Sequence, residues 1–311
     1  MSKKVIAISV GDLNGIGIEI AIQAHDEVLK IAEPIYCISD EMLIRACEKL
    51  GIEKPLNFNT YPIKGDFKIN PGKISKKSGL YSFKSFTKAI RLCEKKLADA
   101  LVTLPIHKEA WHDAGVSFKG HTDMLRDWFQ KDAIMMLGCE KMYVALFTEH
   151  IPLKKVAKRI KTEKLTRFLI DLSKDINAKK IAVLGLNPHA GDGGVLGNEE
   201  QKITKAIKKA NLVLKEELFV GPMVPDTCFT KTMREKHQYF VAMYHDQGLI
   251  PLKALHFDES VNISLKLPII RTSVDHGTAF DIAYKDKTPS LKSYLNAVKL
   301  AVSQSNKNQN S

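Results

Sequence analysis

Residues 5–19 read V-I-A-I-S-V-G-D-L-N-G-I-G-I-E, an apolar run followed by a glycine-rich turn and the beginning of a helical pattern. The apolar run over residues 4–10 predicts a buried β-strand, and the pattern from Ile18 to about Ile31 predicts a helix. A strand joined to a helix by a tight turn is the unit from which parallel α/β sheets are built. We therefore expect this stretch to begin an α/β protein.

The same alternation continues along the chain. Further strands are predicted at 34–39, 100–103, 131–138, 142–148, 180–186, 240–244 and 261–265. Helices are predicted at 41–50, 82–97, 152–175, 198–217 and 281–303, whereas glycines and prolines break residues 51–80 into loops and short strands. Strands that alternate with helices indicate an α/β fold with a largely parallel sheet.

The composition is that of an ordinary globular protein, with 44% hydrophobic and 26% charged residues among 311. It excludes disordered, collagen-like and coiled-coil chains, and the length allows two domains or lobes. The cysteines are dispersed without a C-x-x-C pair, which predicts neither a disulfide framework nor a structural zinc site. We expect five buried free thiols in a reducing cytosol, at Cys37, Cys47, Cys93, Cys139 and Cys228.

The apolar run near the N-terminus is too short for a signal peptide and lacks a small-residue cleavage site. No stretch approaches the roughly twenty apolar residues that a membrane helix needs. The sequence therefore predicts a cytoplasmic protein without a membrane partner.

The formal net charge of +12 raises the question of nucleic-acid binding. In the densest basic region, 154–180, apolar residues recur among the lysines and arginines at helical spacing, which is typical of a solvated helix face. No aromatic residues separate these charges as a single-strand stacking platform requires. We expect no nucleic-acid partner, while a general attraction for anionic small molecules stays open.

The glycine turn at residues 11–17 has the spacing G-x-x-x-G-x-G. It matches neither the dinucleotide-binding G-x-G-x-x-G pattern nor a phosphate-binding P-loop. Two interpretations stay open: a turn that brings backbone amides to an active-site cleft, and a merely structural turn.

Three histidines follow predicted strands, namely His150, His189 and His245. Ligand sites in open α/β sheets gather at the carboxyl ends of strands. Three neutral imidazoles can hold a divalent cation and leave a coordination position open. The alternative is that each is a hydrogen-bonded loop or core residue.

Side chains suited to an anionic ligand occur in the same part of the chain. Lysine binds phosphate as a point charge and arginine as a bidentate fork. The candidates are His121, Thr122, Lys253, Asn262 and Arg271. Asp226, in a proline-rich loop, is either an ordinary turn aspartate or a carboxylate placed for proton transfer or for orienting a cation.

Several of these segments together resemble the 4-hydroxythreonine-4-phosphate dehydrogenase family of vitamin B6 biosynthesis. Singly they are weak signals, but in family order from residue 11 to 283 they are specific. They are G-D-L-N-G-I-G-I-E, A-L-V-T-L-P-I-H-K, G-H-T-D-M-L, N-P-H-A-G-D-G-G, G-P-M-V-P-D-T-C-F, Y-H-D-Q-G-L-I-P-L-K and R-T-S-V-D-H-G-T-A-F-D-I-A.

The resemblance implies an isocitrate/isopropylmalate dehydrogenase-like fold of two α/β/α lobes with an interlobe cleft. The implied lobes span about 1–105 with 282–311, and 106–281, the second carrying most metal and substrate residues. It also implies a homodimer whose metal site is shared, with His150 and His189 from one subunit and His245 from its partner.

The resemblance further implies the remaining site residues. Substrate-binding positions would be His121, Thr122, Lys253, Asn262 and Arg271. Catalytic positions would be Asp226 and Lys253. The segment at 275–283 is similar to the loop that holds the adenosine half of NAD, which points to Asp275, His276 and Gly277 as cofactor-binding residues.

The implied activity is the oxidation of 4-phosphohydroxy-L-threonine by NAD or NADP with one divalent metal, Zn, Co, Mg, Mn or Ni. The product, 2-amino-3-oxo-4-phosphooxybutanoate, would decarboxylate to 3-amino-2-oxopropyl phosphate for pyridoxal 5′-phosphate biosynthesis. A hand-off to pyridoxine 5′-phosphate synthase is conceivable. Alternatives are a dehydrogenase for a related acid of the phosphothreonate type and, more remotely, a phosphate acetyltransferase-like enzyme without NAD.

The chain departs from the family pattern G-D-P-A-G-I-G-P-E in its first turn. Leu13, Asn14 and Ile18 replace proline, alanine and proline, while the glycines and Glu19 remain. We expect the turn to survive with altered stiffness. G-H-T-D also replaces the commoner G-H-T-E, which shortens that carboxylate by one methylene.

Overall fold

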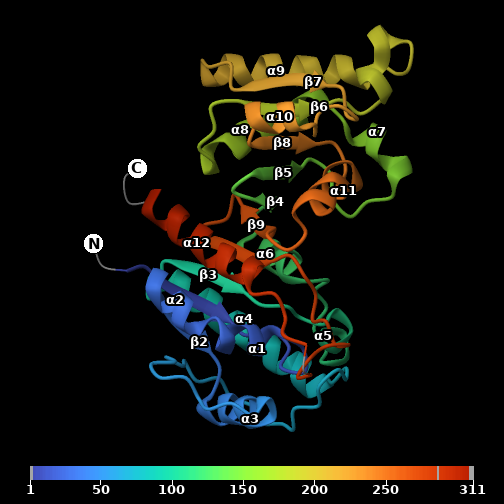
Figure 1. The fold of residues 1–311 in the computed structure, drawn as a ribbon. Coiled ribbons are helices and arrows are strands. Elements are labelled where there is room, and N and C mark those ends of the chain that lie inside the picture. Colours follow the sequence, from blue (N-terminus) through green and yellow to red (C-terminus); the bar gives the residue numbers. More distant parts are fainter. Residues whose placement is uncertain (1–2, 286, 308–311) are drawn as a thin grey trace. The chain divides into compact units, whose positions relative to one another are not determined.

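The computed structural model describes residues 3–285 and 287–307 (Figure 1). It falls into two compact units, which we describe separately. The first unit contains the residues up to Lys131, Val261–Ile263 and the residues from Leu267 on. The second contains Asp132–Ser260 and Ser264–Lys266. Compared with the lobes predicted above, the first unit additionally takes in 106–131 and most of 261–281.

The first unit is built on parallel strands in the order β2-β1-β3-β10. Their bounds are β1 Val5–Ser9, β2 Glu33–Cys37, β3 Ala100–Thr103 and β10 Ile270–Val274. The register sets Ile6 beside Pro34 on one side and Ala100 on the other. Strands buried in this way are apolar nearly throughout, as the N-terminal stretch predicts.

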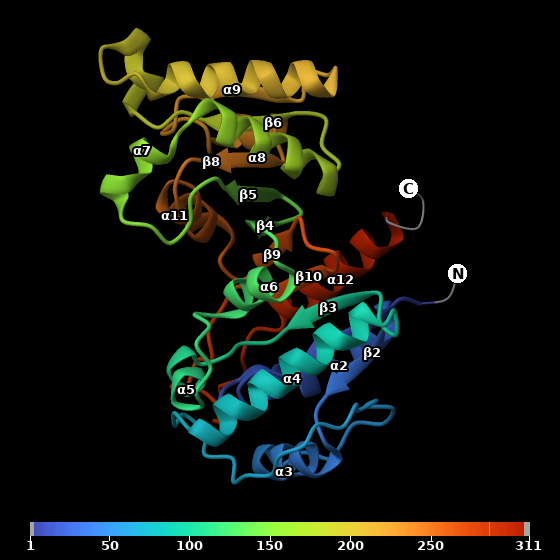
Figure 2. The ribbon, with the colours of Figure 1, turned by 180° about the vertical axis from the view of Figure 1, so that it is seen from behind.

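Helices cover both faces of this part of the sheet. They are α1 Gly17–Gln23, α2 His25–Ile31, α3 Asp40–Leu50, α4 Lys76–Glu94, α5 Lys108–Asp113, α6 His121–Phe129 and α12 Lys292–Lys307. Helices α2 and α12 lie on one face (Figure 1), and the long α4 lies on the other (Figure 2). The first unit is thus an α/β/α sandwich, as predicted for a lobe.

The core of the first unit explains why 106–131 belongs to it. Trp111 of α5 and Leu125 of α6 share a hydrophobic cluster with Phe86 of α4. The indole N–H of Trp111 donates to the hydroxyl of Ser82 at 2.8 Å, so the largest buried side chain has its polar atom satisfied.

The second unit carries the strand order β4-β5-β8-β6-β7. The strands are β4 Ile134–Cys139, β5 Met142–Leu146, β6 Ile181–Leu184, β7 Phe219–Met223 and β8 Tyr239–Ala242. Only the β4–β5 hairpin is antiparallel among the pairings described here. Residues of β9, Val261–Leu265, are divided between the two units.

The helical segments of the second unit are η1 Leu153–Lys155, α7 Val156–Arg159, α8 Thr162–Asp175, η2 Pro188–Gly194, α9 Glu199–Leu214, α10 Lys231–Lys236 and α11 His245–His256. Helix α9 packs on α8 and β7, and α11 packs against β4, β5 and β8. The predicted α/β class with a largely parallel sheet is therefore confirmed.

Two further predictions from the sequence meet the structure here. All five cysteines are free and buried, as expected. The helix predicted from residue 281 instead begins at Lys292. Pro289 disfavours helical backbone at the residue before it, so the preceding segment forms turns. In the described part of the chain no helix is both long enough and apolar enough to cross a membrane.

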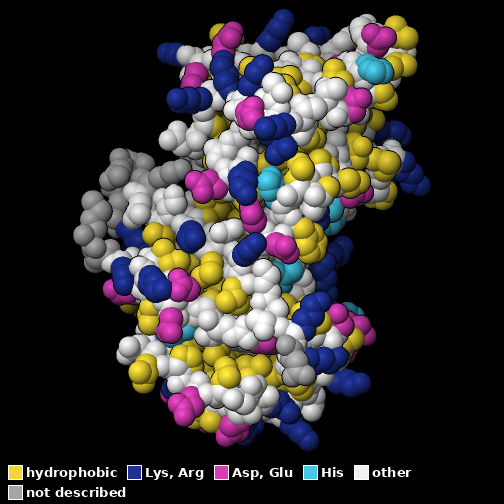
Figure 3. Space-filling model, in the orientation of Figure 1, with side chains coloured by type: hydrophobic (Ala, Val, Ile, Leu, Met, Phe, Trp, Pro, Cys, Tyr) yellow, Lys and Arg dark blue, Asp and Glu magenta, His cyan; other side chains and the backbone are white. Residues whose placement is uncertain are grey.

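Basic residues outnumber acidic ones, 47 to 35, but they do not form a single stripe on the face drawn in Figure 3. Lysines and arginines there stand between aspartates and glutamates. Helix α8 is amphipathic: Leu165, Leu169 and Leu172 are buried, whereas its lysines are exposed. The basic region at 154–180 thus includes the outer face of an amphipathic helix.

His25 is a buried titratable side chain of the first unit, with 1% of its surface exposed. Its Nδ1 lies 3.0 Å from the Tyr36 hydroxyl, and its Nε2 lies 3.0 Å from the carbonyl oxygen of Leu56. A carbonyl only accepts, so Nε2 carries a proton and donates to it. Burial lowers the pKa of His25 below its ordinary value.

We predict that this histidine makes stability depend on pH. Below about pH 6.5 His25 is protonated in the unfolded chain, but it stays neutral in the folded chain until the pH falls to its lowered pKa. Its contribution is therefore complete above that pH and is lost as the pH falls, by up to about 1.4 kcal/mol per unit. Urea unfolding at pH 7.5 and 5.5 should show a smaller pH effect in His25→Gln than in the parent. His112→Gln, whose side chain is 87% exposed, should match the parent.

Candidate functional site

Arg271 organises a polar cluster in the first unit. It lies in β10 with 2% of its surface exposed. Its Nη1 donates to the side-chain oxygen of Asn262 at 3.1 Å, and its Nη2 donates to the hydroxyl of Thr103 at 2.8 Å. Parallel pairing sets Arg271 beside Leu101, so Thr103, two residues on, faces the same side of the sheet.

The charge of this arginine persists at neutral pH. Burial lowers the pKa of Arg271 to about 9, so the guanidinium is still protonated at neutral pH. Both hydrogen bonds described above end on neutral oxygens. A buried, fixed cation of this kind suits recognition of an anionic group such as phosphate.

His121 belongs to the same region. It begins α6, and its ring meets Phe86 edge-on at 4.5 Å between centroids and Trp111 at 5.7 Å. Burial and the nearby charge of Arg271 hold the pKa of His121 well below its usual range, so its imidazole is neutral. Its Nε2 is buried without a hydrogen-bond partner among the residues described. Thr122, the next residue, is buried as well.

The glycine turn is fixed between two segments of the first unit. Gly11 has a φ of +71°, and a side chain there would place Cβ 2.2 Å from the carbonyl oxygen of Pro105. Gly15 lies against Thr278, whose carbonyl oxygen accepts from the N–H of Ile16 at 3.0 Å. The glycine turn therefore packs against the predicted cofactor loop at 275–283 and is hydrogen-bonded to it.

The three predicted cofactor residues lie in that loop. The N–H of Asp275 donates to the hydroxyl of Ser293 at 3.2 Å, just inside the first turn of α12. The Nδ1 of His276 is 3.1 Å from the carbonyl oxygen of Gly277. Gly277 is exposed and has no heavy atom within 4 Å of a would-be Cβ, so its surface is open to a ligand.

Sequence reasoning missed Asp12, a fully buried acid in the same turn. One carboxylate oxygen accepts from the hydroxyl of Ser78 and, at 3.0 Å, from the N–H of Asn14. The other is buried without a hydrogen-bond partner among the described residues. Burial raises the pKa of Asp12. An acid directly after a buried strand is the signal that could have drawn attention to it.

Asn14 explains how the turn tolerates its departure from the family pattern. Its Nδ2 donates to the carbonyl oxygen of Lys73 at 2.7 Å, and its Oδ1 accepts from the N–H of Asn70 at 2.9 Å. An alanine could make neither bond. The amide thus ties the glycine turn to the loop at 70–73.

We predict that Asn14→Ala lowers the free energy of unfolding by about 1–2 kcal/mol, because two partly buried hydrogen bonds are lost. Urea denaturation measures the change. Gln201→Ala, at an exposed site on α9, should leave the midpoint unchanged. An Asn14→Ala midpoint equal to the parent's would show that water replaces both bonds.

In the second unit the structure brings together two of the three predicted metal ligands. His150 follows β5 and His245 begins α11 directly after β8, and their ring centroids are 5.4 Å apart. Strands β5 and β8 are parallel neighbours, so their carboxyl ends meet at one edge. Two residues before each histidine, the hydroxyl of Thr148 donates to the carbonyl oxygen of Met243 at 2.7 Å.

A carboxylate orients the His245 ring. Its Nδ1 is 2.8 Å from Oδ1 of Asp246. Because a carboxylate only accepts, Nδ1 carries the proton and the lone pair of Nε2 is left for a cation. This is the arrangement that metal-binding histidines usually have.

His189 lies in the irregular segment η2 after β6. Its φ is +52°, and the next residues Ala190 to Gly193 also have positive φ, a costly backbone for side-chain-bearing residues. The carboxylate of Glu200 holds the start of this segment by accepting from the N–H groups of Leu186 and Asn187 at 2.9 and 2.8 Å.

Gln247, a second residue that the sequence did not single out, connects this segment to α11. Its side chain accepts from the N–H of Met243 at 2.7 Å and donates to the carbonyl oxygen of Gly185 at 2.7 Å. Even so, no trio of potential ligand atoms within 4.8 Å of one another contains these histidines in the described part of the chain. The division of the three ligands between two subunits stays a prediction.

Asp226 and Lys253 also belong to the second unit. Asp226 is exposed in the turn after β7. Lys253 lies on α11, two helical turns after His245, and its Nζ is 5.5 Å from the ring centroid of Phe257. The predicted anion-binding residues therefore fall into both units, Lys253 in the second and the other four in the first.

Comparisons with known proteins show which proteins this chain is similar to. Residues 26–301 match the family described as pyridoxal phosphate biosynthetic protein PdxA. A curated 4-hydroxythreonine-4-phosphate dehydrogenase of Sulfurimonas denitrificans is 62% identical over 302 residues, covering 97% of this chain and 98% of the relative. One of Campylobacter fetus is 54% identical over 303 residues, again covering 97% and 98%.

Solved structures give the same picture. The crystal structure of 4-hydroxythreonine-4-phosphate dehydrogenase from Klebsiella pneumoniae has a TM-score of 0.84 and 32% identity, covering 97% of this chain and 98% of that one. A phosphotransacetylase from Staphylococcus aureus has a TM-score of 0.56 at 13% identity, with 97% and 94% covered. The second likeness shows a shared fold alone.

Proposed function

The chain belongs to the pyridoxal phosphate biosynthetic protein PdxA family, and we propose from this that it oxidises 4-phosphohydroxy-L-threonine with NAD or NADP and a divalent metal. The product would be 2-amino-3-oxo-4-phosphooxybutanoate, which decarboxylates to 3-amino-2-oxopropyl phosphate. The observation that carries the metal dependence is the His150–His245 pair, 5.4 Å between ring centroids at the ends of adjacent parallel strands.

The donor set fits a divalent cation. Asp246 fixes the tautomer of His245, and the His150 ring lies beside it at the same strand edge. We propose His189 as the third ligand of a site shared across a homodimer. The family resemblance implies that His150 and His189 come from one subunit and His245 from its partner, whereas within this chain His150 and His245 lie together. Imidazole ligands accept Zn, Co and Ni, and also Mg or Mn when oxygen ligands join them.

The bound groups would supply the redox chemistry: the metal as a Lewis acid on the substrate hydroxyl, and the nicotinamide as the hydride acceptor. The chain's own residues bind and orient. Arg271, Asn262, His121 and Thr122 would hold the phosphate away from the reacting carbon, so its binding energy serves positioning. We also propose Lys253 as a substrate-binding and catalytic residue.

Asp226 and the loop at 275–277 remain for proton transfer and cofactor binding. Asp226 is exposed after β7, where it could accept or deliver a proton at the substrate. The loop at 275–277 would hold the adenosine half of the cofactor, with the glycine turn as its support. The unstable product makes a hand-off to pyridoxine 5′-phosphate synthase chemically useful.

The test follows NADH absorbance after mixing the protein with NAD and 4-phosphohydroxy-L-threonine, with and without a chelator. We expect NADH formation that chelation stops and a divalent ion restores. Phosphothreonate in place of the substrate, and NADP in place of NAD, are the matched comparisons. Turnover of phosphothreonate alone would replace this proposal by the related dehydrogenase, and no NADH with either acid would revive the acyltransferase alternative.

A further inference from the structure

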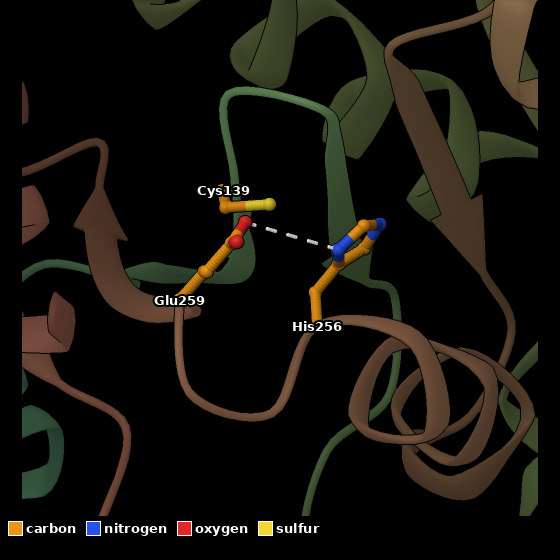
Figure 4. Close-up of side chains that lie close together, drawn as sticks. All are labelled: Cys139, His256 and Glu259. Carbon is orange, nitrogen blue, oxygen red and sulfur yellow. Dashed lines mark ion pairs between the residues drawn. The ribbon is translucent and has the colours of Figure 1, made fainter. Parts of the chain in front are cut away.

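A second cluster of potential metal ligands lies at the other end of α11. Figure 4 shows Cys139 at the end of β4, His256 at the end of α11, and Glu259 three residues beyond it. One ligand atom from each lies within 4.8 Å of the other two. Nδ1 of His256 is 4.0 Å from Oε2 of Glu259. All three residues belong to the second unit.

The cluster is protected rather than spread over the surface. Cys139 is 3% exposed, and the side chain of His256 is 10% exposed. Thiolate, imidazole and carboxylate are the three side-chain groups that bind Zn²⁺, with bonds of about 2.0–2.3 Å. Tetrahedral bonds of that length hold ligand atoms about 3.3–3.7 Å apart, so small side-chain rotations would close the present gaps.

The hairpin between β4 and β5 influences the charge of the Cys139 thiol. The backbone N–H groups of Lys141 and Met142 act to lower the pKa of this thiol, because a nearby N–H group favours the thiolate. Burial nevertheless raises the pKa of the free thiol, so a cation must displace the proton as it binds.

The surroundings of His256 also suit a cation. Burial lowers the pKa of His256, and the charges of Lys141 and Arg234 act in the same direction against the opposing effect of Glu259. The ring is therefore neutral, which is the form that binds metals. The carbonyl end of α11 lies at the cluster and favours positive charge.

One ion pair competes for the site. Nζ of Lys141 lies 3.0 and 3.2 Å from the two carboxylate oxygens of Glu259. The lysine side chain is 63% exposed, and exposed pairs of this kind contribute little to stability. Lys141 can turn into solvent when a divalent ion takes its place.

We propose that Cys139, His256 and Glu259 bind a zinc ion that joins the β4–β5 hairpin to the end of α11. Water would complete a tetrahedral site. Helix α11 begins at His245, so this ion would fix the far end of the helix that carries a proposed ligand of the other metal. The spacing 139, 256, 259 matches no sequence motif for zinc, so this site could not be predicted from the sequence.

Cobalt separates this site from the histidine site, because only a thiolate ligand produces a sulphur-to-cobalt charge-transfer band. We expect the metal-free, full-length protein titrated with Co²⁺ to develop that band, and Zn²⁺ to displace it. In a His150→Ala/His245→Ala background, which removes the histidine site, the band should saturate at one equivalent. Cys139→Ser should abolish the band. Cys228→Ser, a buried cysteine of the same unit, should keep it.

His256→Gln and Glu259→Gln should weaken cobalt binding by at least about tenfold, the smallest loss seen when even an outer-shell partner of a metal is removed. His150→Ala should keep the band, so a failure of the proposed function does not affect this result. Absence of a band, or a band that survives Cys139→Ser, would overturn the proposal.

A thermal measurement gives an independent readout. In a His150→Ala/His245→Ala background, zinc should raise the unfolding midpoint, because a ligand that binds only the folded state stabilises it. Adding Cys139→Ser should remove that rise while Cys228→Ser retains it. A midpoint that zinc leaves unchanged in this background would contradict the site.

Discussion

In a Cys139→Ser background, which removes the other proposed metal site, His245→Ala is expected to abolish metal retention. It should lower kcat by about a thousandfold or more, since a Lewis acid contributes several kcal/mol to such a step. His245 stands beside His150, and Asp246 turns its Nε2 lone pair outward. Removing this ring leaves the cation with one imidazole fewer at the strand edge. The fold should survive, because the side chain begins a helix and does not belong to the core.

The measurement is elemental analysis of the purified variant together with initial rates at saturating substrate. Asp246→Asn should give an intermediate result, a loss of about 10–100-fold in metal affinity, because it disturbs only the tautomer and orientation of the ring. His112→Ala, on an exposed surface of the first unit, should match the parent in both assays. A His245→Ala protein that keeps its histidine-bound metal would remove this residue from the ligand set.

The fold is predictable from sequence wherever apolar residues mark an element. Strand β3 matches its predicted range, 100–103, and β1 differs by one residue at each end. Strands β7 and β10 were not predicted from the sequence. The segment F-V-G-P-M of β7 contains Gly221-Pro222, and I-R-T-S-V of β10 carries Arg271 and two hydroxyl side chains. Their pairing with neighbouring strands supplies what local propensity does not.

Helix α11 was not predicted from the sequence either, because its local sequence disfavours a helix. Gly248 and Pro251 argue locally against a helix. The structure explains the glycine: a Cβ there would lie 2.4 Å from Cγ1 of Val144 and 2.9 Å from Cβ of Ala242, so only glycine lets α11 approach β5 and β8. Tertiary packing, which the sequence does not display, decides this element.

The sequence singles out candidate site residues one by one, but it does not show the contacts between them. Strand ends pointed to His150 and His245, and the structure places their rings together. The partners that hold these side chains, such as Thr103 for Arg271 and Gln247 for the η2 segment, come from distant parts of the sequence. No spacing rule links them, because hydrogen bonds between strand ends depend on the strand order.

Arg271→Ala is expected to raise KM for the phosphorylated substrate by about 30–150-fold, which corresponds to about 2–3 kcal/mol for a charge-assisted hydrogen bond. The guanidinium is charged, buried and fixed by Asn262 and Thr103, so it meets an anion without first losing side-chain freedom. Because the phosphate lies away from the reacting carbon, kcat should change less than KM.

A purely structural role for Arg271 makes different predictions. It would lower the unfolding midpoint and raise KM for NAD as much as KM for the substrate. Arg271→Lys tests the fork itself: a lysine keeps the charge but cannot donate to Asn262 and Thr103 while binding phosphate, so it should recover little of the lost affinity. Arg91→Ala, which removes a cation 5.8 Å from the Trp128 ring, controls for loss of positive charge. A substrate KM unchanged in Arg271→Ala would exclude this residue from the phosphate site.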